Sequence, residues 1–317
     1  MAYPARFHNE FGYGMLRTRL IVGTLLALWG LGVLFLDRYF APWYPISFTF
    51  SVAVTFALGY ELQHLLPAEV RPRSWPLFGS MLLMVIMNWA GALEWPGSPL
   101  AWITGGLLIS FLVMFLVEAW CYTVPGHVTM RLALSLFTVT YIGFLGSFLI
   151  QLRWYFPGGT HSTGPATLAL LLAIFVPKFC DIGAYAAGRL FGKHRMTPLL
   201  SPKKTWEGAA GGVLLAALGA WLMVYGFADW FELDTAQQFP LRRNVVLGMP
   251  GWWATLLFGV AVGIAGMLGD LMESLIKRDL HQKDASANLP GFGGLLDVFD
   301  SILFSVPVTY GILQWVQ

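Results

Sequence analysis

The sequence predicts an all-α, polytopic integral membrane protein with about nine transmembrane helices and a cytoplasmic N-terminus. Of its 317 residues, 57% are hydrophobic and 11% are charged, whereas a soluble domain carries about 25% charged residues. Apolar runs of about twenty residues, the length that crosses a hydrocarbon layer as a helix, recur along the whole chain. These runs are continuous, whereas the strands of an outer-membrane barrel alternate apolar and polar residues, so strands are not expected.

Nine apolar segments are separated by short polar loops. In chain order, the expected spans are 20–36, 43–60, 76–93, 99–118, 130–150, 165–187, 207–228, 252–273 and 294–315. The first follows Arg17 and Arg19 without a small-residue cleavage site behind it, so we expect a retained signal anchor. The next four carry few ionisable residues beyond Glu61, Glu94 and Glu118 near their ends, and we expect them to form a scaffold.

The sixth to ninth spans differ because charged residues lie inside them, starting at Lys178. Such residues are costly in a bilayer unless they are paired or face a wet cavity, which makes them functional candidates. We therefore expect one membrane domain, 1–317. Its N-terminal scaffold helices lie in 1–160, and its catalytic helices and cytoplasmic loops lie in 161–317.

The basic residues predict the orientation of the chain. With the N-terminus inside, the inner segments hold fourteen of the nineteen cations, namely Arg6, Arg17, Arg19, Arg71, Arg73, Arg131, Arg189, Lys193, Arg195, Lys203, Lys204, Lys277, Arg278 and Lys283. The outer loops hold only Arg38, Arg153, Arg242 and Arg243. This positive-inside asymmetry predicts that the inner segments face the cytoplasm and that the C-terminus lies outside. We expect the protein in the cell inner (plasma) membrane, with its catalytic side facing the cytoplasm.

One polar cluster lies inside the sixth span. Lys178, Asp181 and Tyr185 are spaced i, i+3 and i+7, which places them along one face of a helix. A lysine and an aspartate in this arrangement either form part of a functional site or only neutralise each other within the membrane.

A second cluster occupies the inside loop 188–208. Ser201 is expected to cap a helix that has Pro202 at its first position, with Lys203 and Lys204 close to the positive end of that helix. Backbone N–H groups, the helix dipole and two ammonium groups together could bind a polyphosphate. The alternative is a basic loop that only fixes topology. The loop does not satisfy the GxxxxGK[ST] pattern of a P-loop.

A third cluster ends the eighth span, where Asp270, Glu273, Ser274 and Lys277 share one helix face. Paired carboxylates are the hard oxygen ligands that Mg²⁺ prefers, particularly when substrate phosphates complete its coordination. A proton or cation pathway would use the same residue types, so this cluster alone does not separate an enzyme from a transporter.

A fourth cluster opens the ninth span with Asp297, Asp300 and Ser301. The glycines before it, Gly291, Gly293 and Gly294, permit a sharp turn or a close approach of the backbone to a ligand. A plain hairpin turn is the alternative interpretation.

The runs DIGAYAAGRLFGKHR at 181–195 and SPKKTWEG at 201–208 resemble the phosphatidate cytidylyltransferase (CDP-diacylglycerol synthase) family. The C-terminal block resembles it too, through Ser274, Lys277, Arg278, Lys283, Asp284, Pro290, Gly293, Gly294, Asp297 and Asp300. The sequence departs from the family pattern at two positions, because Phe292 stands where the family has histidine and Val298 where it has arginine.

The resemblance implies transfer of a cytidylyl group from CTP to a phosphatidate-like lipid. It implies a metal site of Asp270, Asp297 and Glu273 for one Mg²⁺ ion or two, and catalytic roles for Asp270, Asp297, Lys277 and Asp300. The residues expected to bind nucleotide or phosphate are Ser201, Lys203, Lys204, Asp181 and Arg278. The expected partners are CTP, the lipid phosphate and the bilayer, without nucleic acid; a homodimer is left open.

Three alternatives remain at the level of sequence. The chain could act with CTP on a different lipid phosphate, or it could be a scaffold that has lost activity, as Phe292 and Val298 would suggest. It could also be a secondary transporter that couples ions through Lys178, Asp181, Asp270 and Asp297, although no internal repeat supports this. A CDP-alcohol phosphotransferase is excluded because its DGxxAR…GxxxDxxxD pattern is missing.

Overall fold

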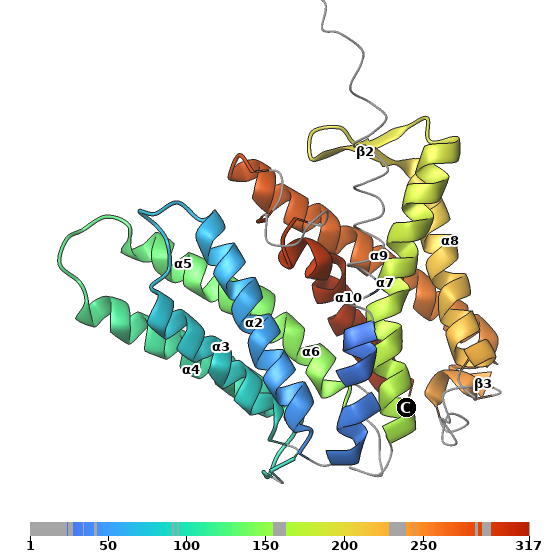
Figure 1. Ribbon diagram of the computed structural model, residues 1–317, viewed down its shortest axis with the longest axis horizontal. Helices are drawn as coiled ribbons and strands as arrows, with labels where there is room; N and C mark the ends of the chain where they lie inside the picture. The colour runs from blue at the N-terminus through green and yellow to red at the C-terminus, as the bar shows by residue number, and fades with distance from the viewer. Residues whose placement is uncertain are drawn as a thin grey trace, which may run out of the picture.

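The computed structural model describes most of the chain, and it is mostly helical (Figure 1). The described residues are 24, 28–33, 35–40, 43–90, 92–93, 95–154, 163–227, 239–243, 245–282, 285–286 and 293–316. Within them, seven helices are long and apolar enough to cross a membrane: Pro45–Leu65, Pro99–Trp120, Val128–Gln151, Gly164–Phe191, Trp206–Phe227, Gly251–Asp279 and Leu296–Trp315. This supports the expected polytopic membrane protein.

Two of the nine expected spans correspond to shorter apolar helices. The expected span 76–93 is the 15-residue helix α3 (Ser74–Asn88). The first expected span falls partly outside the described residues, and its described part from residue 28 onward lies within the helix Leu28–Asp37. The number of crossings and the orientation of the chain therefore stay predictions.

The first group of helices packs on the left of Figure 1. It contains α2 (Pro45–Leu65), α3, α4 (Pro99–Trp120), α5 (Val128–Thr138), the π-helical segment η2 (Val139–Phe144) and α6 (Leu145–Gln151). Buried Leu, Met and Ile side chains form its core. At one end, Glu118 is 5% exposed and pairs with Arg73 at 3.1 Å and Arg131 at 3.0 Å, which ties α4 to the start of α3 and to α5.

The second group contains α7 (Thr163–Phe191), α8 (Trp206–Leu222) with its π-helical end η4 (Met223–Phe227), α9 (Gly251–Asp279) and α10 (Leu296–Trp315). Figure 1 shows α7 beside α8, and α10 between the two groups. α10 packs against α6 and α2 of the first group and against α7 and α9 of the second. Side chains on α10, such as that of Asp300, therefore lie between the two groups.

Two short antiparallel hairpins depart from the all-α expectation: β1 (Arg195–Thr197) with β2 (Ser201–Thr205), and β3 (Val245–Val246) with β4 (Met249–Pro250). They lie at opposite ends of the helices (Figure 1), and β3–β4 follows the short 3-10 helix η7 (Pro240–Arg242). A further 3-10 turn, η1 (Arg38–Phe40), precedes α2.

The prediction that Ser201 caps a helix is wrong. Ser201 begins β2, where its Cα pairs with that of Thr197, and helix α8 begins only at Trp206. Thr205 is the cap: its backbone is extended and its hydroxyl accepts a hydrogen bond from the N–H of Gly208 at 3.1 Å. Pro202 fits an edge strand, which does not need every N–H. Within β2, Lys203 is exposed and Lys204 is half-buried.

Glycines let α7 and α8 pack closely, as small residues do between membrane helices. A Cβ atom at Gly212 would lie 2.7 Å from the carbonyl oxygen of Cys180 and 3.0 Å from the Cβ of Ala184. A side chain at this position must therefore push the two helices apart.

We expect Gly212→Leu to lower the free energy of unfolding by about 1–3 kcal/mol, the usual range for overpacking a tight contact. Thermal unfolding of the detergent-purified protein measures this loss. The control is Gly105→Leu in α4, where a Cβ atom would meet nothing within 4 Å. Equal stability of the two variants would contradict the close packing of α7 on α8.

Candidate active site

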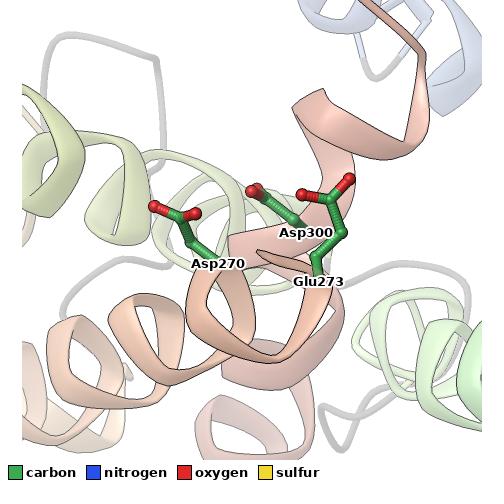
Figure 2. Close-up of side chains that lie close together, drawn as sticks. All are labelled: Asp270, Glu273 and Asp300. Carbon is green, nitrogen blue, oxygen red and sulfur yellow. The ribbon is translucent and has the colours of Figure 1, made fainter. Parts of the chain in front are cut away.

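Three carboxylates converge where α9 meets α10. Asp270 and Glu273 lie one helical turn apart on α9, and Asp300 reaches them from α10 (Figure 2). One oxygen from each carboxylate lies within 4.8 Å of the others. The two helices can approach here because residue 269 is glycine: a Cβ atom there would lie 2.9 Å from that of Phe304.

This acidic triad fits a divalent metal ion. Glu273 is 1% exposed and Asp300 is 6% exposed, and buried carboxylates require compensating positive charge. Glu273 Oε1 has no hydrogen-bond partner among the described residues. Three convergent carboxylates, one with an unused oxygen, form the all-oxygen donor set that Mg²⁺ prefers, with positions left for substrate phosphates.

Lysines from three different elements surround the triad. Lys204 of β2 lies 2.8 Å from an oxygen of Asp270, and Lys277 of α9 pairs with Glu273. Lys178 of α7 lies 3.7 Å from Asp300 and 3.2 Å from Asp181. Each carboxylate of the triad therefore has an ammonium group beside it, so the site can hold both a cation and the phosphate groups of an anion.

The polar face predicted on the sixth span is directed into this site at Lys178 and Asp181. Lys178 donates a hydrogen bond to Ser301 Oγ at 2.7 Å, and Ser301 Oγ donates to Asp181 at 3.2 Å. Pro177 precedes Lys178 inside α7 and cannot donate a backbone hydrogen bond there. Tyr185, the third member of the predicted face, is 68% exposed, and its hydroxyl accepts a hydrogen bond from Arg189.

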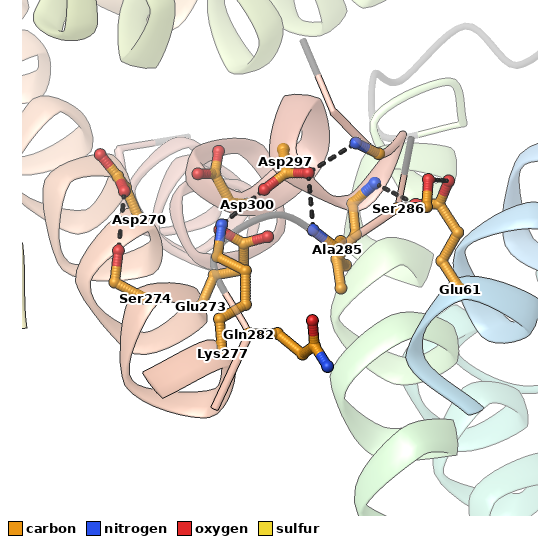
Figure 3. A network of polar contacts seen from close by, with 12 residues as sticks. Glu61, Asp270, Glu273, Ser274, Lys277, Gln282, Ala285, Ser286, Asp297 and Asp300 are labelled. Carbon is orange, nitrogen blue, oxygen red and sulfur yellow. Dashed lines mark hydrogen bonds and ion pairs between the residues drawn. The ribbon is translucent and has the colours of Figure 1, made fainter. Parts of the chain in front are cut away.

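Asp297 lies on the same helix as Asp300 but has other partners (Figure 3). Its carboxylate accepts hydrogen bonds from Lys277, from the N–H of Gly294 at 2.6 Å and from the N–H of Ala285 at 3.0 Å. It therefore holds the turn that leads into α10. The geometry groups Asp300, and not Asp297, with the two acids of α9, so the metal role of Asp297 stays a prediction.

The remaining predicted residues lie around the site. Ser274 Oγ is 3.5 Å from Asp270, and the half-buried Ser201 begins the strand that carries Lys204. Arg278 is exposed and donates to the carbonyl oxygen of Leu200 at 3.4 Å, while Lys203 is exposed on β2. Five further residues that the sequence singles out lie outside the described residues: Lys283, Asp284, Pro290, Gly291 and Phe292.

Nearly the whole chain is similar to one protein family. The model of the cytidylyltransferase family matches residues 17–316. The chain belongs to the cytidylyltransferase family. This agrees with the resemblance that the motifs at 181–208 and 274–300 indicate, and it extends that resemblance over the N-terminal helices.

Curated relatives of this cytidylyltransferase family member include a phosphatidate cytidylyltransferase of Staphylococcus epidermidis. The two are 33% identical over 235 residues, which cover 73% of this chain and 76% of the relative. A phosphatidate cytidylyltransferase of Mycobacterium tuberculosis is 36% identical over 183 residues, covering 50% of this chain and 49% of that protein. One of Haemophilus influenzae is 36% identical over 141 residues, or 44% of each chain.

One residue that contacts this region was not predicted as part of the site. Glu61, on α2 of the first helix group, accepts hydrogen bonds at the start of α10. Its only signal in the sequence is a single acidic residue near the end of an apolar span, and that signal does not indicate a partner more than two hundred residues away.

Proposed function

We propose that this cytidylyltransferase family member is a phosphatidate cytidylyltransferase, which converts CTP and phosphatidate into CDP-diacylglycerol and pyrophosphate for phospholipid synthesis. The observation that carries the proposal is the acidic triad of Asp270, Glu273 and Asp300, surrounded by lysines, in a chain of this family. Relatives with the name phosphatidate cytidylyltransferase support the choice of substrates.

In this reaction an oxygen of the lipid phosphate attacks the α-phosphorus of CTP. A new phosphorus–oxygen bond forms, and the bond from the α-phosphorus to the oxygen that bridges to the β-phosphorus breaks. Pyrophosphate leaves with the electron pair of that bond. Such a transfer requires little covalent work from the protein, because positioning and stabilisation of charge dominate.

We assign the triad to Mg²⁺ and Lys204 to the phosphate groups of the substrates. A bound Mg²⁺ ion would neutralise charge on the phosphate oxygens and orient them. Lys204 lies beside Asp270 on a strand at the helix ends, where it can bind phosphate groups that enter from the aqueous side. Lys178 and Lys277 balance the charge of the buried acids and keep Asp300 and Glu273 in place.

We further propose that the site faces the cytoplasm and that the protein resides in the inner (plasma) membrane. The cations around the site, including Lys203, Lys204, Lys277 and Arg278, belong to the set that the positive-inside rule places on the cytoplasmic side. CTP and a lipid phosphate could meet the triad there, at the membrane surface.

Val298 is the reason to test which lipid phosphate accepts the cytidylyl group. It follows Asp297 in the first turn of α10. The family pattern has arginine at this position. A valine cannot bind phosphate, so a different lipid phosphate is the second candidate acceptor.

The test is pyrophosphate release by the detergent-purified protein. We expect release only when CTP, phosphatidate and Mg²⁺ are all present, with omission of each as a control. Release with another lipid phosphate but not with phosphatidate would change the acceptor. Absence of release from correctly folded protein with every lipid phosphate offered would contradict the proposed enzyme.

A further inference from the structure

The carboxylate of Glu61 extends from α2 to the neighbouring turn that precedes α10 (Figure 3). The side chain is buried, with Glu61 4% exposed. One oxygen accepts hydrogen bonds from Ser286 Oγ at 2.8 Å and from the N–H of Leu295 at 3.0 Å, and the other accepts from the N–H of Leu296 at 2.8 Å.

These bonds satisfy the beginning of α10. The first N–H groups of a helix have no partner within the helix, and a negative charge beside them is favoured by the helix dipole. Leu295, the residue at the cap position, supplies no side-chain hydrogen bond of its own. Glu61 therefore caps the N-terminus of α10, a role that usually belongs to a side chain of the same segment.

The turn is shaped to accept this carboxylate. A Cβ atom at Gly294 would lie 2.6 Å from Glu61 Oε2 and 3.1 Å from Asp297 Oδ2. A side chain at this position would therefore displace the Glu61 carboxylate from the turn. Glu61 and Asp297 thus bind neighbouring residues of the same turn: Glu61, from α2, accepts from Ser286 and Leu295, and Asp297, from α10 itself, accepts from Ala285 and Gly294.

The position of this turn determines where the acids of α10 lie. Asp297 is in the first turn of the helix, where it pairs with Lys277, and Asp300 follows one turn later in the triad. A helix that starts without its cap can fray or shift at this end. Asp300 would then move relative to Asp270 and Glu273, which are fixed on α9.

We propose that Glu61 is a positioning residue for the reaction: from the N-terminal helix group it fixes the start of α10, and through it the acids Asp297 and Asp300. This inference rests on the proposed function. It gives the N-terminal helices a direct part in building the site, and it does not place Glu61 in contact with the substrates or the metal.

The test compares Glu61→Gln with Glu118→Gln. Both remove a buried carboxylate from the first helix group, but Glu118 pairs with Arg73 and Arg131 and, among the described residues, has no partner in the site. We expect Glu61→Gln to lower kcat by about tenfold or more, the scale of a small misplacement of reacting groups. The Mg²⁺ concentration for half-maximal turnover should rise severalfold, whereas Glu118→Gln should change only the temperature of unfolding.

A second readout does not need the substrates. Mn²⁺, as a probe for the triad, is titrated into each protein and the free ion is followed by electron paramagnetic resonance. We expect weaker Mn²⁺ binding in Glu61→Gln and unchanged binding in Glu118→Gln. Unchanged Mn²⁺ affinity and unchanged kcat in Glu61→Gln would overturn the positioning role. Absence of turnover in the wild-type protein would instead count against the proposed function alone.

Ser286→Ala keeps the test decisive if Glu61→Gln does not fold. This variant removes the hydroxyl donor to Glu61 and leaves the backbone donors of Leu295 and Leu296 in place. A smaller change of the same kind, in both kcat and Mn²⁺ affinity, would support the positioning role. Wild-type values for both would overturn it.

Discussion

Asp300→Asn is expected to lower kcat for cytidylyl transfer by about a hundredfold or more, the scale seen when one preorganised electrostatic group is removed from an active site. Asparagine keeps the volume of the side chain, so α10 can still pack against α7 and α9. It removes one of three negative charges from the triad, and with it an oxygen donor for the metal. It also leaves Lys178 with one acid fewer beside it.

The measurement for Asp300→Asn is the initial rate at saturating CTP and phosphatidate, together with Mn²⁺ affinity. The control is Asp37→Asn. Asp37 is also fully buried, but it caps α2 by accepting hydrogen bonds from the N–H groups of Ile46 and Ser47, away from the triad. We expect this control to lose stability and keep its rate once folded. A wild-type rate in Asp300→Asn would remove Asp300 from the site.

Lys204→Met is the second large expected effect, and its neighbour provides a matched control. The two lysines are adjacent on β2, so the strand turns them to opposite faces: Lys204 lies 2.8 Å from Asp270, and Lys203 is exposed. We expect Lys204→Met to lower kcat/KM by about a hundredfold, because a charge-assisted contact to the reacting phosphates is lost.

Lys203→Met should lower kcat/KM much less than Lys204→Met, and raising the salt concentration should weaken its effect further, because exposed charges are screened. The comparison uses the same steady-state assay with CTP as the varied substrate. Equal losses in the two variants would mean that the hairpin attracts the nucleotide only through its total charge. That result would contradict direct binding of the reacting phosphates by Lys204.

The sequence could predict the features that depend on local spacing. Asp270 and Glu273 are three residues apart, so any helix places them on one face, and the structure shows both in the triad. The same spacing predicts that Lys178 lies beside Asp181, and their charged groups are 3.2 Å apart. Apolar runs likewise predicted the membrane helices, seven of which are long enough to cross among the described residues.

Features that depend on partners distant in the sequence could not be predicted in this way. Ser201, Pro202 and the lysines after them resemble the first turn of a helix, but pairing with Arg195–Thr197 makes the segment a strand. Asp297 and Asp300 share a helix face, and only the approach of α9 decides that Asp300 joins the triad. Glu61 contacts a turn that follows it by more than two hundred residues, so no local pattern connects them.

Transfer of the cytidylyl group to a lipid is tested most directly by following the α-phosphate of CTP. Purified protein is incubated with phosphatidate, Mg²⁺ and CTP that is radioactively labelled at the α-phosphorus, and the lipid is then extracted. We expect label in the lipid fraction, with one pyrophosphate released for each labelled lipid, and almost no label there with Asp300→Asn. Pyrophosphate release that leaves the label in the aqueous phase would mean hydrolysis of CTP, and would contradict a cytidylyltransferase that acts on lipid.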